Sequence, residues 1–198
     1  MTDPPIAGRN PPPDSIDAVR DSVRRHLDGL AALSHRADAL AALIQAIRQP
    51  LRAGGRVFTC GNGGSAAEAL HLAEEMIGRF RRERAPLPAV CLAADPTALT
   101  CIANDYGYEQ VFARQLEGLG RPGDVLVALS TSGRSPSIVR ALETARRLGI
   151  ATIGLLGPPG SPAEPHCDQV LTLPGVEPAV VQEAHLIVVH LILERIDG

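Results

Sequence analysis

The chain has 198 residues, of which 45% are hydrophobic, and carries a formal net charge of −3 with a pI near 6.1. This length suits one domain with a single core. The lack of excess Lys and Arg argues against binding to the phosphate backbone of nucleic acids, and no apolar run reaches the roughly 18–20 residues that cross a bilayer. We therefore expect no nucleic-acid partner and no membrane association.

The N-terminal residues 1–13 contain five prolines and no apolar period, which predicts a flexible arm. This segment also lacks the basic start and apolar stretch of a signal peptide. Four cysteines are scattered without a CxxC pair, a pattern typical of reduced thiols. Together these features predict a cytoplasmic protein.

From Ser15 to about Arg52, apolar residues recur at spacings of three and four, which predicts two amphipathic helices. Asp14 or Ser15 is the expected N-cap, and two glycines at 54–55 follow the second helix. We assign 14–53 to an N-terminal helical extension of a single domain that spans 14–198. The apolar stripes of both helices must be buried, either on the sheet or on another subunit.

After residue 55, short strand-like runs alternate with helical stretches, which indicates a parallel sheet covered on both faces. The predicted strands are 57–60, 89–92, 125–129, 152–155 and 170–173. The predicted helices are 65–78, 97–103, 108–117, 136–148 and 178–196. The expected fold class is therefore α/β, with three αβα layers and a five-stranded parallel sheet. Ligands of such folds bind beyond the carboxyl ends of the strands, so the loops after Cys60 and Leu129 are the candidates.

The first expected strand runs into GNGGSA at 61–66, followed by a helix. Glycines let backbone amides approach a ligand, and a helix N-terminus favours an anion. Ser65 and Glu68 also fit a capping box, in which Ser65 merely caps the helix. The pattern G-x-G-x-x-A fits a dinucleotide fingerprint as well, but its acidic partner is missing because Asp95 comes too late.

The third expected strand ends in STSGRSP at 130–136, and another helix follows. Ser135 is the expected N-cap, and Pro136 falls at the first helical position, where proline is favoured. Hydroxyls, a glycine and a helix N-terminus form a compact set of donors for a phosphate. Two such loops at strand ends of one sheet predict a phosphate-binding site.

Polar residues on apolar helices form a second candidate cluster. Glu68, His71 and Glu75 share one stripe of the helix at 65–78, where His71 and Glu75 fit either metal ligation or a surface ion pair. The last helix is apolar almost all round and should be buried. It nevertheless carries Gln182, Glu183, His185 and His190. Buried polar groups need partners, which favours a site shared by the two helices over a lone core histidine.

Two further features qualify this picture. Gln182 and His190 are separated by a rise of roughly 12 Å, so both reach one point only if it lies between them. A basic cluster also follows the helix at 65–78. It consists of Arg79, Arg81, Arg82 and Arg84. Because Glu83 interrupts this cluster, we expect a solvated surface there.

Several segments together resemble the phosphoheptose isomerase family of SIS-domain proteins. They are CGNGGS at 60–65, LHLAEEM at 70–76, AND at 103–105, STSGRS at 130–135 and QEAHLIVVH at 182–190. Their order and spacing make the resemblance specific, and it extends from about Gly55 to the C-terminus. The two-helix N-terminal extension is also typical of the family.

The resemblance implies an SIS fold, a homotetramer with active sites at subunit interfaces, and one zinc ion per subunit. It implies isomerisation of sedoheptulose 7-phosphate to a D-glycero-D-heptose 7-phosphate in heptose (nucleotide-sugar) biosynthesis. Glu75 and His190 are then the acid–base pair of an enediolate mechanism. The implied zinc ligands are His71, Glu75, Gln182 and His190. The implied substrate-binding residues are Asn62, Gly63, Gly64, Ser65, Glu75, Asn104, Asp105, Ser130, Thr131, Ser132, Ser135 and Gln182.

The chain departs from the family before Gln182. Residues 179–181 read Ala-Val-Val where the family has an acidic residue and an arginine, and the loop before them is one residue shorter. If the family's acidic residue orients sugar hydroxyls, its replacement alters substrate preference or the configuration at C2, with Glu177 as a substitute.

A second function is also compatible with this family. Relatives such as the DnaA initiator-associating protein keep the fold but act as binding proteins. A non-catalytic phosphosugar-binding regulator is therefore the alternative to an isomerase. The presence of both Glu75 and His190 favours catalysis.

Overall fold

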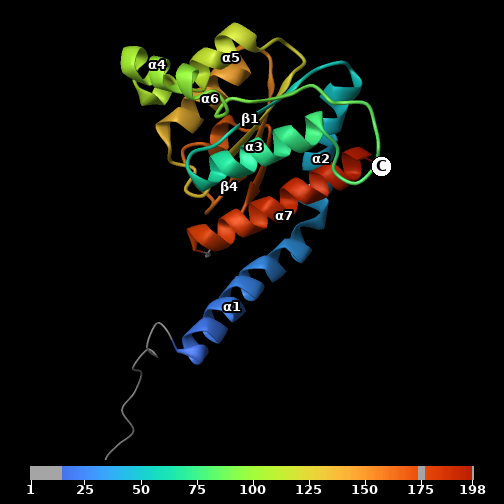
Figure 1. The fold of residues 1–198 in the computed structure, drawn as a ribbon, viewed down its shortest axis with the longest axis vertical. Helices are drawn as coiled ribbons and strands as arrows, with labels where there is room; N and C mark the ends of the chain where they lie inside the picture. The colour runs from blue at the N-terminus through green and yellow to red at the C-terminus, as the bar shows by residue number, and fades with distance from the viewer. Residues whose placement is uncertain (1–14, 174–176, 198) are drawn as a thin grey trace, which may run out of the picture.

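A computed structural model describes residues 15–173 and 177–197 (Figure 1). The flexible arm predicted at 1–13 and the candidate cap Asp14 lie outside these residues. The described chain begins with α1 (Ile16–Ala31), a 3₁₀ turn and α2 (Ala37–Arg52). The remaining elements are β1 (Val57–Cys60), α3 (Gly64–Ile77), β2 (Ala89–Cys91), α4 (Pro96–Tyr106), α5 (Ala113–Leu119), β3 (Val125–Ser130), α6 (Pro136–Arg147), β4 (Ala151–Leu156), β5 (Gln169–Thr172) and α7 (Pro178–Asp197).

These elements confirm the expected alternation of strands and helices. Each predicted strand is present to within a residue at either end, and the sheet is fully parallel. The helix predicted at 108–117 is wrong in its first half. There the chain makes a 3₁₀ turn, Tyr108–Gln110, before α5 begins at Ala113. Gly107, with a φ of 89°, separates α4 from this turn, because that backbone conformation is one that glycine adopts at no steric cost.

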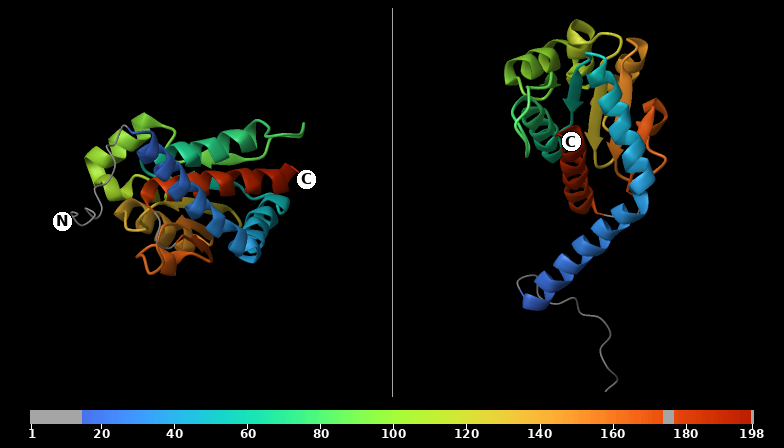
Figure 2. Two further views of the ribbon diagram at one scale, coloured as in Figure 1. Left: turned by 90° about the horizontal axis from the view of Figure 1, so that it is seen from below. Right: turned by 90° about the vertical axis from the view of Figure 1, so that its right-hand side faces the viewer.

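Helices cover both faces of the sheet, in three layers (Figures 1 and 2). Alternate side chains of each strand point to opposite faces, so Val57 and Val125 join the core under α2, α3 and α7. Phe58 and Leu126 point the other way and join the core under α5 and α6. The expected three-layer α/β/α fold is therefore confirmed.

The strand order β2-β1-β3-β4-β5 fixes the position of the site. The chain leaves β1 towards one edge of the sheet to form β2, and then returns to the other side of β1 to form β3. In doubly wound sheets, the crevice at such a reversal lies outside the carboxyl ends of the two central strands. The loops after β1 and β3 are thereby brought side by side, as the sequence predicted.

The first helix, α1, projects from the body of the domain (Figures 1 and 2). Ser15 caps it by accepting a hydrogen bond from the amide of Ala18. Its apolar side chains remain exposed, with Ile16 at 72% and Leu27 at 62%. The apolar stripe of α2, by contrast, is buried on the sheet. The apolar stripe of α2 is therefore buried on the sheet of its own chain, as one of the two expectations required. The apolar stripe of α1 remains exposed.

Among the described helices, none is both long enough and apolar enough to cross a bilayer.

Candidate active site

A cavity of about 140 Å³ lies where the loops after β1 and β3 meet. Its lining brings together much of the predicted phosphate site. The lining residues are Asn62, Ser65, Leu129, Ser130, Thr131, Ser132, Ser135 and Gln182. The cavity opens towards the N-termini of α3 and α6, and both helix termini favour an anion.

The start of α3 shows how Ser65 is used. The helix begins at Gly64, and its N-cap is Gly63, whose φ is 56°. Ser65 therefore lies inside the first turn, where it cannot act as N-cap, so the capping-box alternative is wrong. Its side chain is buried against the cavity instead. Ser65 is therefore a lining residue of the cavity rather than a helix cap.

The loop after β3 is ordered by its own hydroxyls. Ser130 Oγ accepts the amide of Gly133 at 3.0 Å, and Ser132 Oγ accepts the amide of Arg134 at 3.2 Å. Ser135 occupies the N-cap position of α6 as predicted, followed by Pro136. Its hydroxyl makes no capping hydrogen bond with α6, so it can point to a ligand in the cavity.

Asn62 joins three parts of the site. Its Nδ2 donates to Ser137 Oγ on α6 at 3.0 Å, and its Oδ1 accepts from the hydroxyl of Tyr108 at 2.9 Å. The amide is therefore held by both its donor and its acceptor, which fixes its orientation. Tyr108 was missed by the sequence reasoning, because no local pattern indicates that a tyrosine after α4 reaches the loop after β1.

Helices α3 and α7 lie side by side and run in the same direction (Figures 1 and 2). At their N-terminal ends, the side-chain amide of Gln182 packs directly on Gly64, where a Cβ atom would lie 2.8 Å from Gln182 Cδ. Near their middle, Nε2 of His71 lies 3.2 Å from Nε2 of His190. Polar residues of these two helices therefore lie in contact, as the prediction of a shared site requires.

The contact of His71 with Glu74 indicates which ring nitrogen of His71 carries a hydrogen. Its Nδ1 lies 2.9 Å from a carboxylate oxygen of Glu74, which can only accept, so Nδ1 carries the hydrogen. Nε2 of a neutral His71 then offers a lone pair towards His190. The 3.2 Å contact between the two ring nitrogens is a hydrogen bond when one of them carries a proton, and both nitrogens are also suitable metal ligands. The sequence reasoning did not single out Glu74, although its spacing of three residues from His71 was a usable signal.

Glu75 completes a compact group of donors. His71, Glu74 and Glu75 each offer one ligand atom, and these atoms lie within 4.8 Å of one another. Gln182, the fourth predicted ligand, lies in the cavity between the loops after β1 and β3, about two helical turns before this group. The structure thus brings His71 close to Glu75 and His190, and places Gln182 at the other end of the site.

Two buried polar residues on the same helices are perturbed by their surroundings. Burial raises the pKa of Glu68 to about 7, so this carboxyl is partly protonated near neutral pH. Burial lowers the pKa of His185 to about 4. His185 is fully buried and therefore neutral, which makes it a core histidine rather than a partner of His190.

Some predicted residues lie outside the cavity. Asn104 and Asp105 are exposed in the last turn of α4, where Asn104 Nδ2 donates to Asp105 at 2.8 Å. The Glu177 carboxylate lies 3.3 Å from the guanidinium of Arg25 on α1, so in this chain it is engaged by α1. Gly63 is exposed at the start of α3.

Comparisons with known proteins place this chain in a family. The family model described as the SIS domain matches residues 20–157. A phosphoheptose isomerase from Roseiflexus sp. (strain RS-1) is 44% identical over 184 residues, which cover 93% of this chain and 90% of that protein. Another from Bradyrhizobium sp. (strain ORS 278) is 45% identical over 189 residues, covering 92% and 96%. This chain belongs to the phosphoheptose isomerase family of SIS-domain proteins.

Solved structures of the phosphoheptose isomerase family share the fold. GmhA from Neisseria gonorrhoeae superposes with a TM-score of 0.85 at 34% identity, covering 91% of this chain and 97% of that one. The phosphoheptose isomerase from Francisella tularensis gives a TM-score of 0.88 at 32% identity, with coverage of 92% and 97%. The resemblance inferred from the short motifs is therefore confirmed, along with the SIS fold.

The contact between Gly64 and Gln182 gives a testable prediction. In Gly64→Ala, the new methyl group would displace the flexible amide of Gln182 from the phosphate cavity. We expect unchanged thermal stability and about tenfold weaker binding of sedoheptulose 7-phosphate by calorimetry, as for the loss of one hydrogen bond to a charged group. Gly118→Ala is the control, because a Cβ there meets no atom within 4 Å. Unchanged binding by Gly64→Ala would show that Gln182 does not contact the ligand.

Proposed function

We propose that this chain is an isomerase that converts sedoheptulose 7-phosphate to a D-glycero-D-heptose 7-phosphate in heptose biosynthesis. The single observation that carries the proposal is the arrangement along the α3–α7 pair. The phosphate-type cavity lies at the N-terminal ends of these helices, and the His71–His190 contact lies about 10 Å further along α3. A seven-carbon sugar phosphate is long enough to reach from one to the other.

The chemistry follows from these positions. The loop after β3 and the N-terminus of α6 would hold the phosphate, and this remote grip positions the reacting carbons. Glu75 would remove a proton from the carbon next to the carbonyl and return one to its neighbour. His190 would move a proton between the two oxygens of the enediolate.

The acid–base assignment is tested by turnover of sedoheptulose 7-phosphate in wild type, Glu75→Gln and His190→Ala, with NMR identification of the product. We expect turnover by wild type and a fall of at least about 10²-fold in kcat for each variant, because each removes one proton-transfer group. Glu83→Gln is the matched control, since its side chain is 89% exposed. Wild-type protein that binds the sugar phosphate without turnover would instead indicate a phosphosugar-binding regulator.

We further propose one zinc ion per chain, held by His71, Glu75 and His190. Gln182, the fourth ligand that the family resemblance implies, lies about two helical turns away at the cavity, so it does not fit as a ligand of this ion. The donors fit zinc, which accepts mixed nitrogen and oxygen ligands. The hydrogen bond from His71 to Glu74 is the kind that orients zinc-bound histidines. When bound, the ion would supply a Lewis acid that polarises the substrate carbonyl.

The zinc proposal is tested by elemental analysis and chelation. We expect about one zinc per chain in wild type, and a loss of metal in His71→Ala and His190→Ala. Glu74→Gln should weaken zinc binding about 10-fold to 100-fold, because it replaces the carboxylate partner of the ligand's other nitrogen with a neutral amide. His35→Asn, on the exposed 3₁₀ turn before α2, is the control. Metal-free protein whose activity resists chelation would contradict the proposal.

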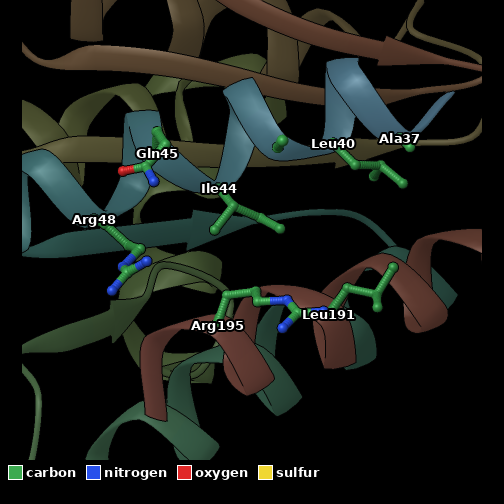
Figure 3. A pocket seen from close by; sticks show the side chains of 8 residues that line it. Ala37, Leu40, Ile44, Gln45, Arg48, Leu191 and Arg195 are labelled. Atoms are coloured by element: carbon green, nitrogen blue, oxygen red, sulfur yellow. The ribbon is translucent and has the colours of Figure 1, made fainter. Parts of the chain in front are cut away.

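We also propose a cytoplasmic homotetramer with active sites shared between subunits. The described cysteines are all free, which suits a reducing compartment. Two apolar surfaces support assembly from copies of this chain. One is the exposed stripe of α1, and the other is the groove between α2 and α7 (Figure 3), which Leu40, Ile44 and Leu191 line. Because Asn104 and Asp105 lie outside the cavity of their own chain, a neighbouring subunit would be needed to bring them to a substrate.

The assembly is tested by analytical ultracentrifugation. We expect a tetramer for wild type and smaller species for Val23→Asp, since a charge in the apolar stripe of α1 opposes its burial. Asp21→Ala is the control, because two residues along a helix place it on the opposite side from Val23. A monomeric wild type would contradict the proposal.

A further inference from the structure

The segment after α3, residues 79–85, lies along one face of α7; we call it the strap. The ring of Phe80 stacks on the imidazole of His190, with 5.3 Å between centroids and 20° between planes. The strap residues Arg81 and Arg84 form ion pairs with Glu194 and Asp197, each at 2.6 Å. His190, Glu194 and Asp197 follow one another at spacings of four and three, so they share one face of the helix.

Arg84 joins the strap to both helices of the site. Its Nη2 donates to the carbonyl of Glu75 and its Nη1 to the carbonyl of Met76, both at 2.8 Å. Its Nε donates to the carboxylate of Asp197 at the end of α7. The Arg84 side chain is only 14% exposed. The sequence-based expectation of a solvated basic surface is therefore wrong for this arginine.

The parallel direction of α3 and α7 explains why a cation lies there. The C-terminal ends of the two helices are adjacent, and each carries partial negative charge and carbonyls without intrahelical partners. Burial by itself raises the pKa of Asp197, but hydrogen bonds from the backbone of Arg81 and Arg82 and from Arg84 hold it below its usual range. The Asp197 carboxylate is thus charged, and the guanidinium of Arg84 bridges two negative groups on different helices.

We propose that Arg84 is a positioning residue for the Glu75–His190 pair. This inference rests on the proposed function of that pair. Arg84 holds the last turn of α3 through the backbone of Glu75 itself, and it holds α7 through Asp197, about two turns beyond His190. The contact with Asp197 also keeps the strap in place, and with it the ring of Phe80 on the imidazole. Loss of Arg84 would therefore move both reacting groups while leaving the phosphate cavity, at the opposite ends of the helices, in place.

The test compares steady-state kinetics of Arg84→Gln, Asp197→Asn and Arg84→Lys with wild type. We expect kcat to fall roughly 10-fold to 100-fold in Arg84→Gln and Asp197→Asn, as for a misplacement of about 1 Å, with KM unchanged. Arg84→Lys should be intermediate, because an ammonium keeps the charge but cannot bridge three acceptors as the guanidinium fork does. Arg82→Gln removes the same charge from the neighbouring exposed position and should match wild type.

A second readout does not depend on turnover. Nitrogen-15 NMR of labelled histidines should show altered resonances for His71 and His190 in Arg84→Gln and in Asp197→Asn, and none in Arg82→Gln. If wild type does not isomerise the sugar, the proposed function fails, and these resonances still decide the role of Arg84. If Arg84→Gln does not fold, Arg84→Lys and Asp197→Asn carry the test. Unchanged kcat and histidine resonances, with only a lower melting temperature, would overturn the proposal.

Discussion

The site depends on the close parallel packing of α3 against α7. The two helices meet at three levels: Gln182 on Gly64, His190 beside His71, and Asp197 joined by Arg84 to the end of α3. Adjacent parallel helices place like ends of their dipoles together, which is unfavourable without compensation. The N-terminal ends are open to an anion in the cavity, and the C-terminal ends receive a buried guanidinium. The packing of α3 against α7 therefore contributes to the core and also determines where an anion and a cation are favoured in the site.

The strand order explains why the N-terminal ends of α3 and α7 lie at the cavity. Reversal of the chain between β1 and β3 leaves the loops after these strands side by side at their carboxyl ends. Asn62 then links them by its hydrogen bond to Ser137, at the start of α6. Strands β1 and β3 are buried on both faces and form a rigid base. The loops that follow them, which carry the hydroxyl groups, are therefore held in place although their side chains are small.

The polar residues of α7 differ in how deeply they are buried. His185 faces the core, where burial keeps it neutral, and His190 lies at the half-buried seam with α3. Glu183 points to α1 and binds His26 at 2.7 Å, beside the ion pair of Arg25 with Glu177. One helix thus contributes to the core, to the site and to the docking of α1. Its nearly uniform hydrophobicity is explained by contacts on several sides rather than by a single buried stripe.

The sequence by itself determined the strands, most of the helices, the phosphate-type loops and the family. Each of these depends on local spacing, on capping residues such as Ser135 and Pro136, or on short motifs in a fixed order. Only the tertiary structure decided which polar residues meet. Arg84 and Glu83 are neighbours in one charged run, yet the Arg84 side chain is only 14% exposed, because two helix ends converge on it, whereas that of Glu83 is 89% exposed. Tyr108 reaches Asn62 across 46 residues of chain. Such contacts are set by the packing of whole elements, which no local pattern records.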